Sequence, residues 1–323
     1  MSLTPGGHPM VAILGPTGSG KSELALRVAE VFAGEIVGCD SLQVYRYFDI
    51  GTAKLREQER RGVGHHMIDV AEPDEEFSAG EFARRSRGVL EEIAARGRLP
   101  IVAGGTGFYL RALVDGLVRA PARDDTVRAR LAEREEKRPG SLHRLLSRFD
   151  PAGAKGIHPR DVRKLIRAVE VCLLTRRRLS EAYAAGRDSL LGFRCLKIGV
   201  NPPREALYGR LDERCQWMFD HGLIDEVRRI LLLGFPPDVK PLESHGYRQA
   251  LHLLRGDLTR PQAVVYAQRN TRRYAKRQWT WFRRESGLEW FDGFGDDAGL
   301  QTAVMARVRE YVQGPEAASV KLG

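Results

Sequence analysis

Met10-Val11-Ala12-Ile13-Leu14-Gly15-Pro16-Thr17-Gly18-Ser19-Gly20-Lys21-Ser22 is the stretch that decides the fold. Five apolar residues predict a buried strand, and the glycine-rich segment after them matches the phosphate-loop pattern G-x-x-x-x-G-K-[ST]. Residues 22–32 then carry apolar side chains at helical spacing. A strand, a glycine-rich turn and a helix in this order let backbone N–H groups and the positive end of the helix converge on an anion.

The loop therefore predicts a phosphate site in which Lys21 supplies a mobile positive charge and the Ser22 hydroxyl is a ligand for Mg²⁺. The residues predicted to form it are Gly15, Pro16, Thr17, Gly18, Ser19, Gly20, Lys21 and Ser22. An NTPase also needs an acidic residue at a strand end to hold Mg²⁺. The apolar run 101–103 leads into Gly104-Gly105-Thr106-Gly107 without one, whereas Asp40 follows the run 35–39. Asp40 could be a metal ligand or a general base, so the loop alone leaves a kinase or an ATPase open.

Further apolar runs predict how the chain is organised. Strands are predicted at residues 10–14, 35–39, 99–103 and 196–200, and helices at 22–32 and 82–95. Strands that alternate with helices favour an α/β fold with a parallel sheet flanked by helices. Between residues 121 and 194 the strand-like runs are replaced by charged helical patterns. We therefore predict a core made of residues 1–120 and 195–323, mainly helical after Arg204, and an all-helical insertion at 121–194.

The charge distribution indicates a polyanionic partner. The chain has a net charge of +10, and residues 121–190 contain 17 Lys and Arg against 10 Asp and Glu, a local excess of +7. Lys and Arg bind nucleic acid by displacing the counterions that phosphates condense. No apolar stretch approaches the roughly 20 residues that cross a bilayer, and residues 1–7 do not resemble a signal peptide. We therefore expect a cytoplasmic protein without a membrane partner.

Seven blocks of sequence, in this order, resemble the tRNA dimethylallyltransferase family, also called isopentenylpyrophosphate transferases. They are DSLQVYRYFDIGTAK (residues 40–54), HHMIDV (65–70), GGTGFYLRAL (104–113), HPRD with RAVE (158–161 and 167–170), LYGRLDER (207–214), GYR (246–248) and AKRQWTW (275–281). One such match arises easily by chance, but seven in order do not. The chain lacks the Cys/His extension of eukaryotic members, which favours a bacterial-type protein.

The resemblance implies a P-loop kinase-like core whose loop holds a diphosphate leaving group. Family members transfer the dimethylallyl group of dimethylallyl diphosphate to N6 of the adenosine 3′ of the anticodon, position 37. By resemblance, Asp40 is the general base, while Lys21, Arg214 and Thr17 stabilise the departing diphosphate together with Mg²⁺. Arg210, one helical turn before Arg214, is a weaker candidate for the same role.

The resemblance also implies that the partner is the anticodon stem-loop of a tRNA, bound by a monomer. The target base must leave its stack to react. The residues expected to contact the tRNA are Asp40, Ser41, Leu42, Gln43, Thr106, Arg128, Arg163, Lys164, Leu165, Ile166 and Arg167. The last six lie in the basic insertion, to which the charge count points independently.

Some features stay open at this point. Residues 269–284 mix Arg and Lys with four aromatic residues, which suits either nucleic-acid binding or a helix core. His65 and His66 are adjacent and lack a matching ligand cluster, so structural roles are favoured over a metal site. Arg160 and the pair Ser244-His245 depart from the family pattern.

Three other functions compete with tRNA modification. An adenylate isopentenyltransferase would carry out the same chemistry on a free nucleotide, for which the basic insertion has little use. A small-molecule kinase or ATPase would release γ-phosphate. A tRNA-binding module would bind without modifying its partner.

Overall fold

A computed structural model describes residues 7–118, 120–121, 123–184 and 186–314. Most of the N-terminal stretch that bears on the signal-peptide expectation lies outside these residues. The chain divides into two compact units. One comprises the residues up to Leu113 together with those from Leu190 onward, and the other runs from Val114 to Ser189. From sequence, the insertion was expected at 121–194.

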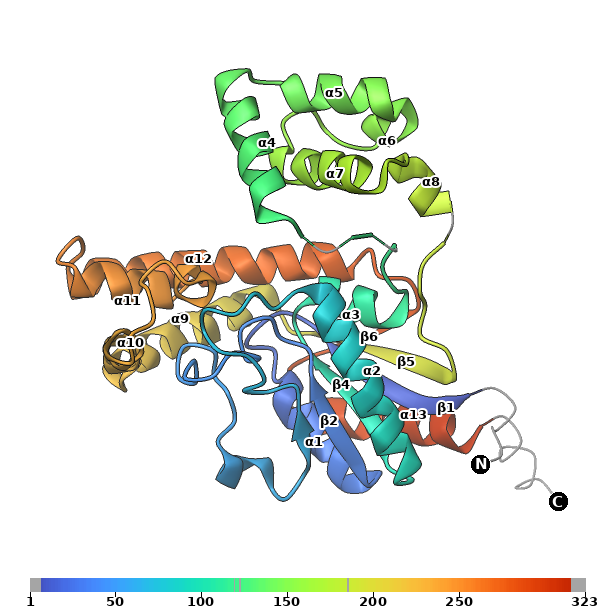
Figure 1. The fold of residues 1–323 in the computed structure, drawn as a ribbon. Coiled ribbons are helices and arrows are strands. Elements are labelled where there is room, and N and C mark those ends of the chain that lie inside the picture. Colours follow the sequence, from blue (N-terminus) through green and yellow to red (C-terminus); the bar gives the residue numbers. More distant parts are fainter. Residues whose placement is uncertain (1–6, 119, 122, 185, 315–323) are drawn as a thin grey trace. The chain divides into compact units, whose positions relative to one another are not determined.

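The larger unit is built on a six-stranded parallel sheet with the strand order β3-β2-β4-β1-β5-β6 (Figure 1). Its strands are β1 (His8–Leu14), β2 (Gly34–Gly38), β3 (His65–His66), β4 (Leu99–Gly104), β5 (Phe193–Asn201) and β6 (Leu288–Asp292). The predicted α/β class with a parallel sheet is confirmed. β3 and β6, at the two edges of the sheet, were not predicted.

The register brings the functional loops to one edge of the sheet. Leu14, the last residue of β1, lies opposite Gly104 of β4 and Gly199 of β5. Because the strands are parallel, the segments that follow β1, β2, β4 and β5 all leave from this edge. Ligands of open α/β sheets bind there, beyond the carboxyl ends of the strands.

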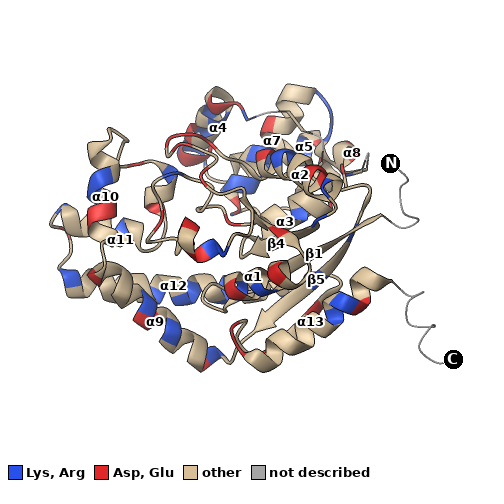
Figure 2. Ribbon diagram, turned by 90° about the horizontal axis from the view of Figure 1, so that it is seen from below, with Lys and Arg blue, Asp and Glu red and all other residues tan. Residues whose placement is uncertain are grey.

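Helices cover both faces of the sheet. Successive side chains of β1 point to opposite faces of the sheet. On one face, Val11 and Ile13 pack into a core with helices α1 (Lys21–Val31) and α13 (Ala298–Gln313). Met10, Ala12 and Leu14 are equally buried but point the other way. α2 (Ala79–Ala95) packs on β2 and β4, and it lies with α3 (Gly107–Val114) on the opposite side of the strands from α13 (Figure 2).

The predicted boundaries differ from the observed ones by a few residues. The helix expected from Phe82 begins at Ala79, because Ser78 caps it by accepting a hydrogen bond from the N–H of Glu81 at 3.1 Å. The region after Arg204 is mainly helical, as predicted, apart from β6. Its helices are α9 (Arg204–Asp220), η2 (Lys240–Glu243), α10 (Leu223–Leu232), α11 (Tyr247–Leu254) and α12 (Arg260–Phe282). A short 3-10 helix, η1 (Glu57–Arg60), precedes β3.

The smaller unit is helical and has its own core. Its helices are α4 (Asp125–Lys137), α5 (Ser141–Phe149), α6 (Pro151–Lys155), α7 (Val162–Thr175) and α8 (Leu179–Ala184). Leu131, Leu142, Leu146 and Leu165 meet in this core, each of them buried. Within the described ranges, neither unit has a helix that is long and apolar enough to pass through a bilayer.

Candidate active site

The phosphate-binding loop closes tightly between β1 and α1. Gly18 and Gly20 have φ angles of +79° and +83°, in the left-handed region that favours glycine. A side chain at Gly15 would place its Cβ atom 2.7 Å from the carbonyl oxygen of Val200. Gly20 is equally confined, because its Cβ atom would lie 2.7 Å from the backbone nitrogen of Gly295. These glycines fix the backbone in a conformation of the kind in which N–H groups can converge on an anion.

Lys21 is drawn inward at the start of α1. Its Nζ atom donates a hydrogen bond to the carbonyl oxygen of Pro16 at 2.6 Å. The pKa of Lys21 is lowered to about 7, mainly by burial; Asp40 opposes the shift, and the positive charge of Arg214 adds to it. A bound anion would raise this pKa, so the environment of Lys21 favours an anionic ligand.

Arg214 reaches the loop from α9. Its Nη2 atom donates a hydrogen bond to Thr17 Oγ1 at 2.7 Å. Burial lowers the pKa of Arg214 below its ordinary value. Its Nε atom is buried and has no hydrogen-bond partner within the described residues. A buried guanidinium with a free donor is costly unless a ligand accepts from it.

Gln278 fixes the backbone of the loop, a contact that sequence reasoning missed. Its Oε1 atom accepts from the N–H of Thr17 at 2.7 Å, and its Nε2 atom donates to the carbonyl oxygen of Gly105 at 2.9 Å. Thr17 and Gln278 are 261 positions apart in the sequence. The only signal was that Gln278 lies within the block 275–281.

Asp40 follows β2 and turns the chain back on itself. Its Oδ1 atom accepts hydrogen bonds from the N–H groups of Leu42 at 2.8 Å and Gln43 at 3.3 Å. Thr106 Oγ1 accepts from the N–H of Ser41 at 3.0 Å. The residues Asp40 to Gln43 and Thr106, grouped from sequence, therefore do lie together. Oδ2 of Asp40 has no hydrogen bond to any described residue, which leaves it available to a ligand.

One pocket brings residues of the phosphate-binding loop and of the segment after β2 together. Thr17, Asp40 and Arg214 line it together. The rest of its wall mixes apolar with polar side chains: Leu42, Cys215, Met218, Phe219, Leu223 and Ala267 on one hand, Thr52, His245, Thr271 and Tyr274 on the other. Convergent polar groups beside apolar side chains are typical of a small-molecule site.

His245 and Tyr274 complete the wall, and neither was assigned to the site from sequence. Their rings lie 4.7 Å apart, centre to centre, at a tilt of 37°. Burial raises the pKa of Tyr274, and Asp40 adds to the effect, while hydrogen bonding to Thr106 opposes it. Tyr274 belongs to the basic aromatic stretch 269–284, which therefore contributes at least this side chain to the pocket.

Arg210 has a different environment from Arg214. It forms a two-pronged ion pair with Asp296, at 2.9 and 2.7 Å, on the exposed side of α9. Asp296 also lies beside Gly20 in the loop. Arg210 thus braces the segment before α13 against the loop, and only Arg214 enters the pocket.

Glu226 anchors the segment that follows Asp40. Its buried carboxylate accepts hydrogen bonds from the N–H groups of Asp49 and Ile50, at 3.1 and 2.8 Å, and from Gly51 at 3.4 Å. It also accepts from the hydroxyl of Tyr247. Gly51 lines the pocket, so a carboxylate on α10 determines part of its wall.

Within the helical unit, the predicted tRNA contacts separate into three groups. Arg163 and Lys164 are exposed on α7. Leu165 is fully buried and Ile166 packs against the same core, so the side chain of Leu165 faces its own helices and is not available to RNA. Arg128 and Arg167 both bind the buried carboxylate of Glu170, through contacts of 2.9 and 2.7 Å.

Glu170 is the centre of that ion-pair cluster. Burial alone would raise its pKa, but hydrogen bonds from Arg128, from the N–H of Asp124 and from Arg167 outweigh burial and lower it. Arg128 and Arg167 therefore stabilise the helical unit, whatever else they bind.

The adjacent histidines have structural partners. His66 Nε2 lies 2.7 Å from Glu35 Oε2, and His65 Nδ1 lies 2.9 Å from the carbonyl oxygen of Val63. In the described part of the chain, no group of three or more His, Cys, Asp or Glu residues is placed to hold a metal. Any metal must therefore rely on other ligands.

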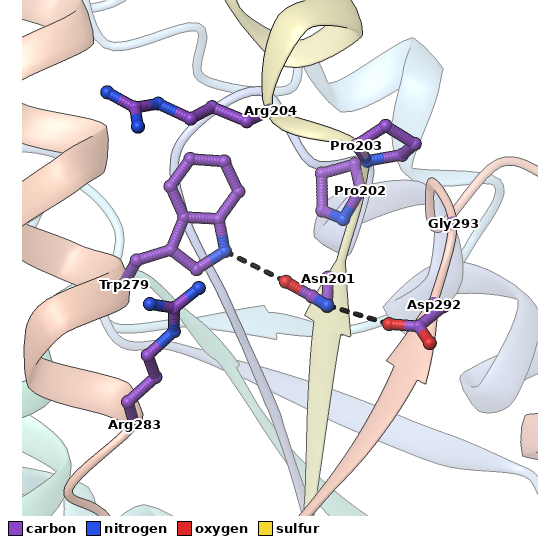
Figure 3. A pocket seen from close by; sticks show the side chains of 8 residues that line it. All are labelled: Asn201, Pro202, Pro203, Arg204, Trp279, Arg283, Asp292 and Gly293. Atoms are coloured by element: carbon purple, nitrogen blue, oxygen red, sulfur yellow. Dashed lines mark hydrogen bonds between the residues drawn. The ribbon is translucent and has the colours of Figure 1, made fainter.

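A second cavity opens at the ends of β5 and β6 (Figure 3). The Trp279 indole lies between the guanidinium groups of Arg204 and Arg283. Its Nε1 atom donates to Asn201 Oδ1 at 3.1 Å, and Asn201 Nδ2 donates to Asp292 Oδ1 at 2.7 Å. This chain of hydrogen bonds ties α12 to both strands. Trp279 is thus structural, as one of the two interpretations of residues 269–284 expected.

Comparison with known proteins identifies the family. The model of the family "IPP transferase" matches residues 43–285, well over half of the chain. The chain belongs to the IPP transferase family. A relative named tRNA dimethylallyltransferase from Solibacter usitatus is 61% identical over 304 residues, covering 94% of this chain and 99% of that protein.

Solved structures agree with this family assignment. The tRNA isopentenylpyrophosphate transferase of Bacillus halodurans superposes with a TM-score of 0.70 at 35% identity, covering 95% of this chain and 97% of the other. A eukaryotic dimethylallyltransferase described as acting on tRNA superposes with a TM-score of 0.82 at 27% identity, covering 95% and 80%. The P-loop kinase-like core expected from sequence is therefore the fold of an IPP transferase.

Proposed function

We propose that this IPP transferase moves the dimethylallyl group of dimethylallyl diphosphate to N6 of adenosine 37 in tRNA, forming N6-isopentenyladenosine. The observation that carries the proposal is the pocket in which Thr17 of an anion-binding loop, Arg214 and Asp40 face the same space. The names of the relatives support both the group transferred and the acceptor.

The phosphate-binding loop suits the diphosphate of the donor. The charge of Lys21 and the loop's remaining N–H groups would hold its oxygens; Pro16 has no N–H, and that of Thr17 already binds Gln278. Negative charge grows on the bridging oxygen as the allylic carbon departs, and Arg214 and Thr17 lie where they would stabilise it. Preorganised donors aimed at a developing charge give some of the largest catalytic effects known.

Ser22 suits Mg²⁺ bound together with the diphosphate. It is the second residue of α1 and is exposed, so its hydroxyl is accessible beside Lys21. Mg²⁺ usually keeps several waters and binds few protein groups plus substrate phosphates, which agrees with a single hydroxyl ligand. The ion would neutralise charge on the leaving diphosphate.

Asp40 suits the acceptor side of the reaction. The lone pair of the adenine N6 amine is delocalised into the ring, so the amine is a weak nucleophile. As N6 bonds to the allylic carbon, the carbon–oxygen bond to diphosphate breaks and an N6 proton passes to Asp40. The free Oδ2 atom of Asp40 is the acceptor we assign. Leu42, Met218 and Phe219 provide an apolar wall for the dimethylallyl group.

The tRNA would be held by both units. Asp40 to Gln43 and Thr106 would contact the extruded base and its neighbours, while the exposed Arg163 and Lys164 would bind backbone phosphates. Arg128 and Arg167 would contribute their remaining donors. We propose that the protein acts as a monomer in the cytoplasm.

Mass spectrometry of tRNA nucleosides tests the proposal. Unmodified tRNA incubated with enzyme, dimethylallyl diphosphate and Mg²⁺ should yield N6-isopentenyladenosine at position 37. The same assay with AMP as acceptor should give no product, and product formed only with AMP would identify an adenylate isopentenyltransferase. Release of γ-phosphate from ATP that depends on Lys21 would instead identify a kinase or an ATPase. Binding of tRNA without any product would leave a binding module.

A further inference from the structure

His245 is the one imidazole that lines the active-site pocket. It lies two residues before α11, next to Gly246, whose φ angle of +88° makes the turn into the helix. The same position departs from the family pattern in the sequence. Because the ring shares a pocket with Asp40 and Arg214, a ligand bound there would meet it.

The His245 ring is held in place by stacking. It lies 4.7 Å from the Tyr274 ring, and Thr106 lies close enough to the Tyr274 hydroxyl to act on its pKa. Thr106 in turn accepts from the N–H of Ser41. These contacts connect His245 to the segment that begins at Asp40, on the acceptor side of the pocket.

The nitrogens of His245 are unused. Among the described residues, neither ring nitrogen has a hydrogen-bond partner, and the side chain is only partly buried. Burial lowers the pKa of His245 to about 4, and the charges of Arg214 and Arg277 act in the same direction. At neutral pH the ring is therefore uncharged, with one N–H donor and one nitrogen acceptor.

A partly buried ring without protein partners keeps its N–H donor and its nitrogen acceptor free for a ligand of the pocket. A phenylalanine would also stack on Tyr274 but would offer neither group. A neutral donor suits the ring nitrogens of a purine, which are acceptors, better than it suits a diphosphate already served by Lys21 and Arg214.

We propose that His245 is a specificity-determining residue that donates a hydrogen bond to a ring nitrogen of the extruded adenine. The inference rests on the proposed function, since it takes that adenine as the acceptor. The hydrogen bond would orient the base so that N6 faces Asp40 and the allylic carbon.

A cycle of protein and substrate changes tests the inference. Three anticodon stem-loops carry 1-deaza-, 3-deaza- or 7-deazaadenosine at position 37, each lacking one ring nitrogen, beside a stem-loop with adenosine. Transfer is measured with the unaltered enzyme and with His245→Phe, which keeps the stacking and removes both nitrogens. A neutral hydrogen bond is worth roughly 1 kcal/mol, so one analogue should slow the unaltered enzyme by about 5- to 10-fold. The same analogue should not slow His245→Phe any further.

Two further variants serve as controls. His245→Gln restores an N–H donor and should recover part of the rate with adenosine. His221→Phe changes a histidine that stacks on Trp217 at 4.6 Å but lies outside the pocket, and it should behave as the unaltered enzyme does. The melting temperature of His245→Phe establishes that the variant is folded.

The outcomes separate the inference from the function on which it rests. If the unaltered enzyme modifies no RNA, the proposed function fails. If it modifies RNA but the effects of analogue and His245→Phe are simply additive for all three analogues, His245 does not contact a ring nitrogen. A defect of His245→Phe confined to the KM for dimethylallyl diphosphate would place the contact on the donor and overturn the inference.

Discussion

Arg214 of α9 donates a hydrogen bond to Thr17 of the phosphate-binding loop, across 197 positions of sequence. The contact joins the helical part of the larger unit to the end of the central strand. It also aims a buried guanidinium at the place where a leaving diphosphate would gain charge. Arg214 therefore gives the first prediction.

Replacing Arg214 with Ala should lower kcat by about 10²- to 10³-fold, the usual loss when one preorganised donor is removed. Binding of tRNA should change little. Arg210→Ala is the matched control, because Arg210 lies one turn away on the same helix but pairs with Asp296. Steady-state kinetics should show a far smaller loss for it. Equal losses for the two variants would mean that Arg214 acts only through the fold.

Replacing Asp40 with Asn should lower transfer by roughly 10²- to 10⁴-fold, the range of a general base. Asparagine keeps an oxygen that can accept from the N–H groups of Leu42 and Gln43, so the turn should survive. Filter binding should find an almost unchanged affinity for tRNA. A variant that still transfers at the normal rate would remove Asp40 from the mechanism.

Binding of inorganic pyrophosphate should take up a proton at Lys21. The pKa of Lys21 is about 7 in the free protein, so at pH 8 the side chain is mostly neutral, and a bound anion would raise this pKa. The affinity for pyrophosphate should therefore fall as the pH rises above 7. It should level off once the pH exceeds the pKa of Lys21 in the complex. Calorimetry in buffers of different ionisation enthalpy measures this uptake.

Lys21→Met should bind pyrophosphate more weakly and lose this part of the proton uptake, leaving only the titration of pyrophosphate itself. Identical proton uptake in the two proteins would show that Lys21 keeps its charge throughout.

Replacing Glu226 with Ala should destabilise the larger unit by about 3 kcal/mol, because it strands several buried donors. Tyr247→Phe removes only one of these hydrogen bonds and should cost about 1 kcal/mol. Asp225→Ala is the control, since this neighbour on α10 forms an exposed ion pair with Arg228. Urea unfolding measures all three. A loss for Glu226→Ala no larger than for Asp225→Ala would contradict the anchoring role.

Arg163 and Arg128 should differ in what they do for the helical unit. Arg163→Ala should weaken tRNA binding and lower the slope of log K against log salt by about 1, as for one lost phosphate contact. Its stability should be unchanged, because the side chain is exposed. Arg128→Ala leaves the buried Glu170 short of two hydrogen bonds and should lower the melting temperature. The reverse pattern would contradict both assignments.

Much of the core could be predicted from sequence because its signals are local. β1, β2, β4 and β5 are apolar runs buried on both faces, and such runs stand out in a sequence. β6 was missed because Leu288 to Asp292 is half-exposed at the edge of the sheet and mixes acidic with aromatic residues. β3 has only two residues, too few for any periodicity.

The pocket could be predicted only in part. Thr17, Lys21 and Asp40 belong to motifs that follow strands, so their position at one edge of the sheet follows from the fold class. Gln278 reaches the phosphate-binding loop through helix packing, and His245 reaches the pocket through a turn. No local sequence pattern records either contact. Leu165 was predicted to contact tRNA from a family motif, but its side chain is buried in the helical core. A motif does not show whether a residue is shared for packing or for binding.

The position of β1 has a consequence for synthesis on the ribosome. This strand is made first, yet its neighbours β4 and β5 begin only at Leu99 and Phe193. Gly20 finally packs against Gly295, near the end of the chain. One hydrogen-bonding edge of β1 therefore stays unpaired until β4 has emerged and the other until β5 has, and the anion-binding loop gains its contact with Gly295 later still.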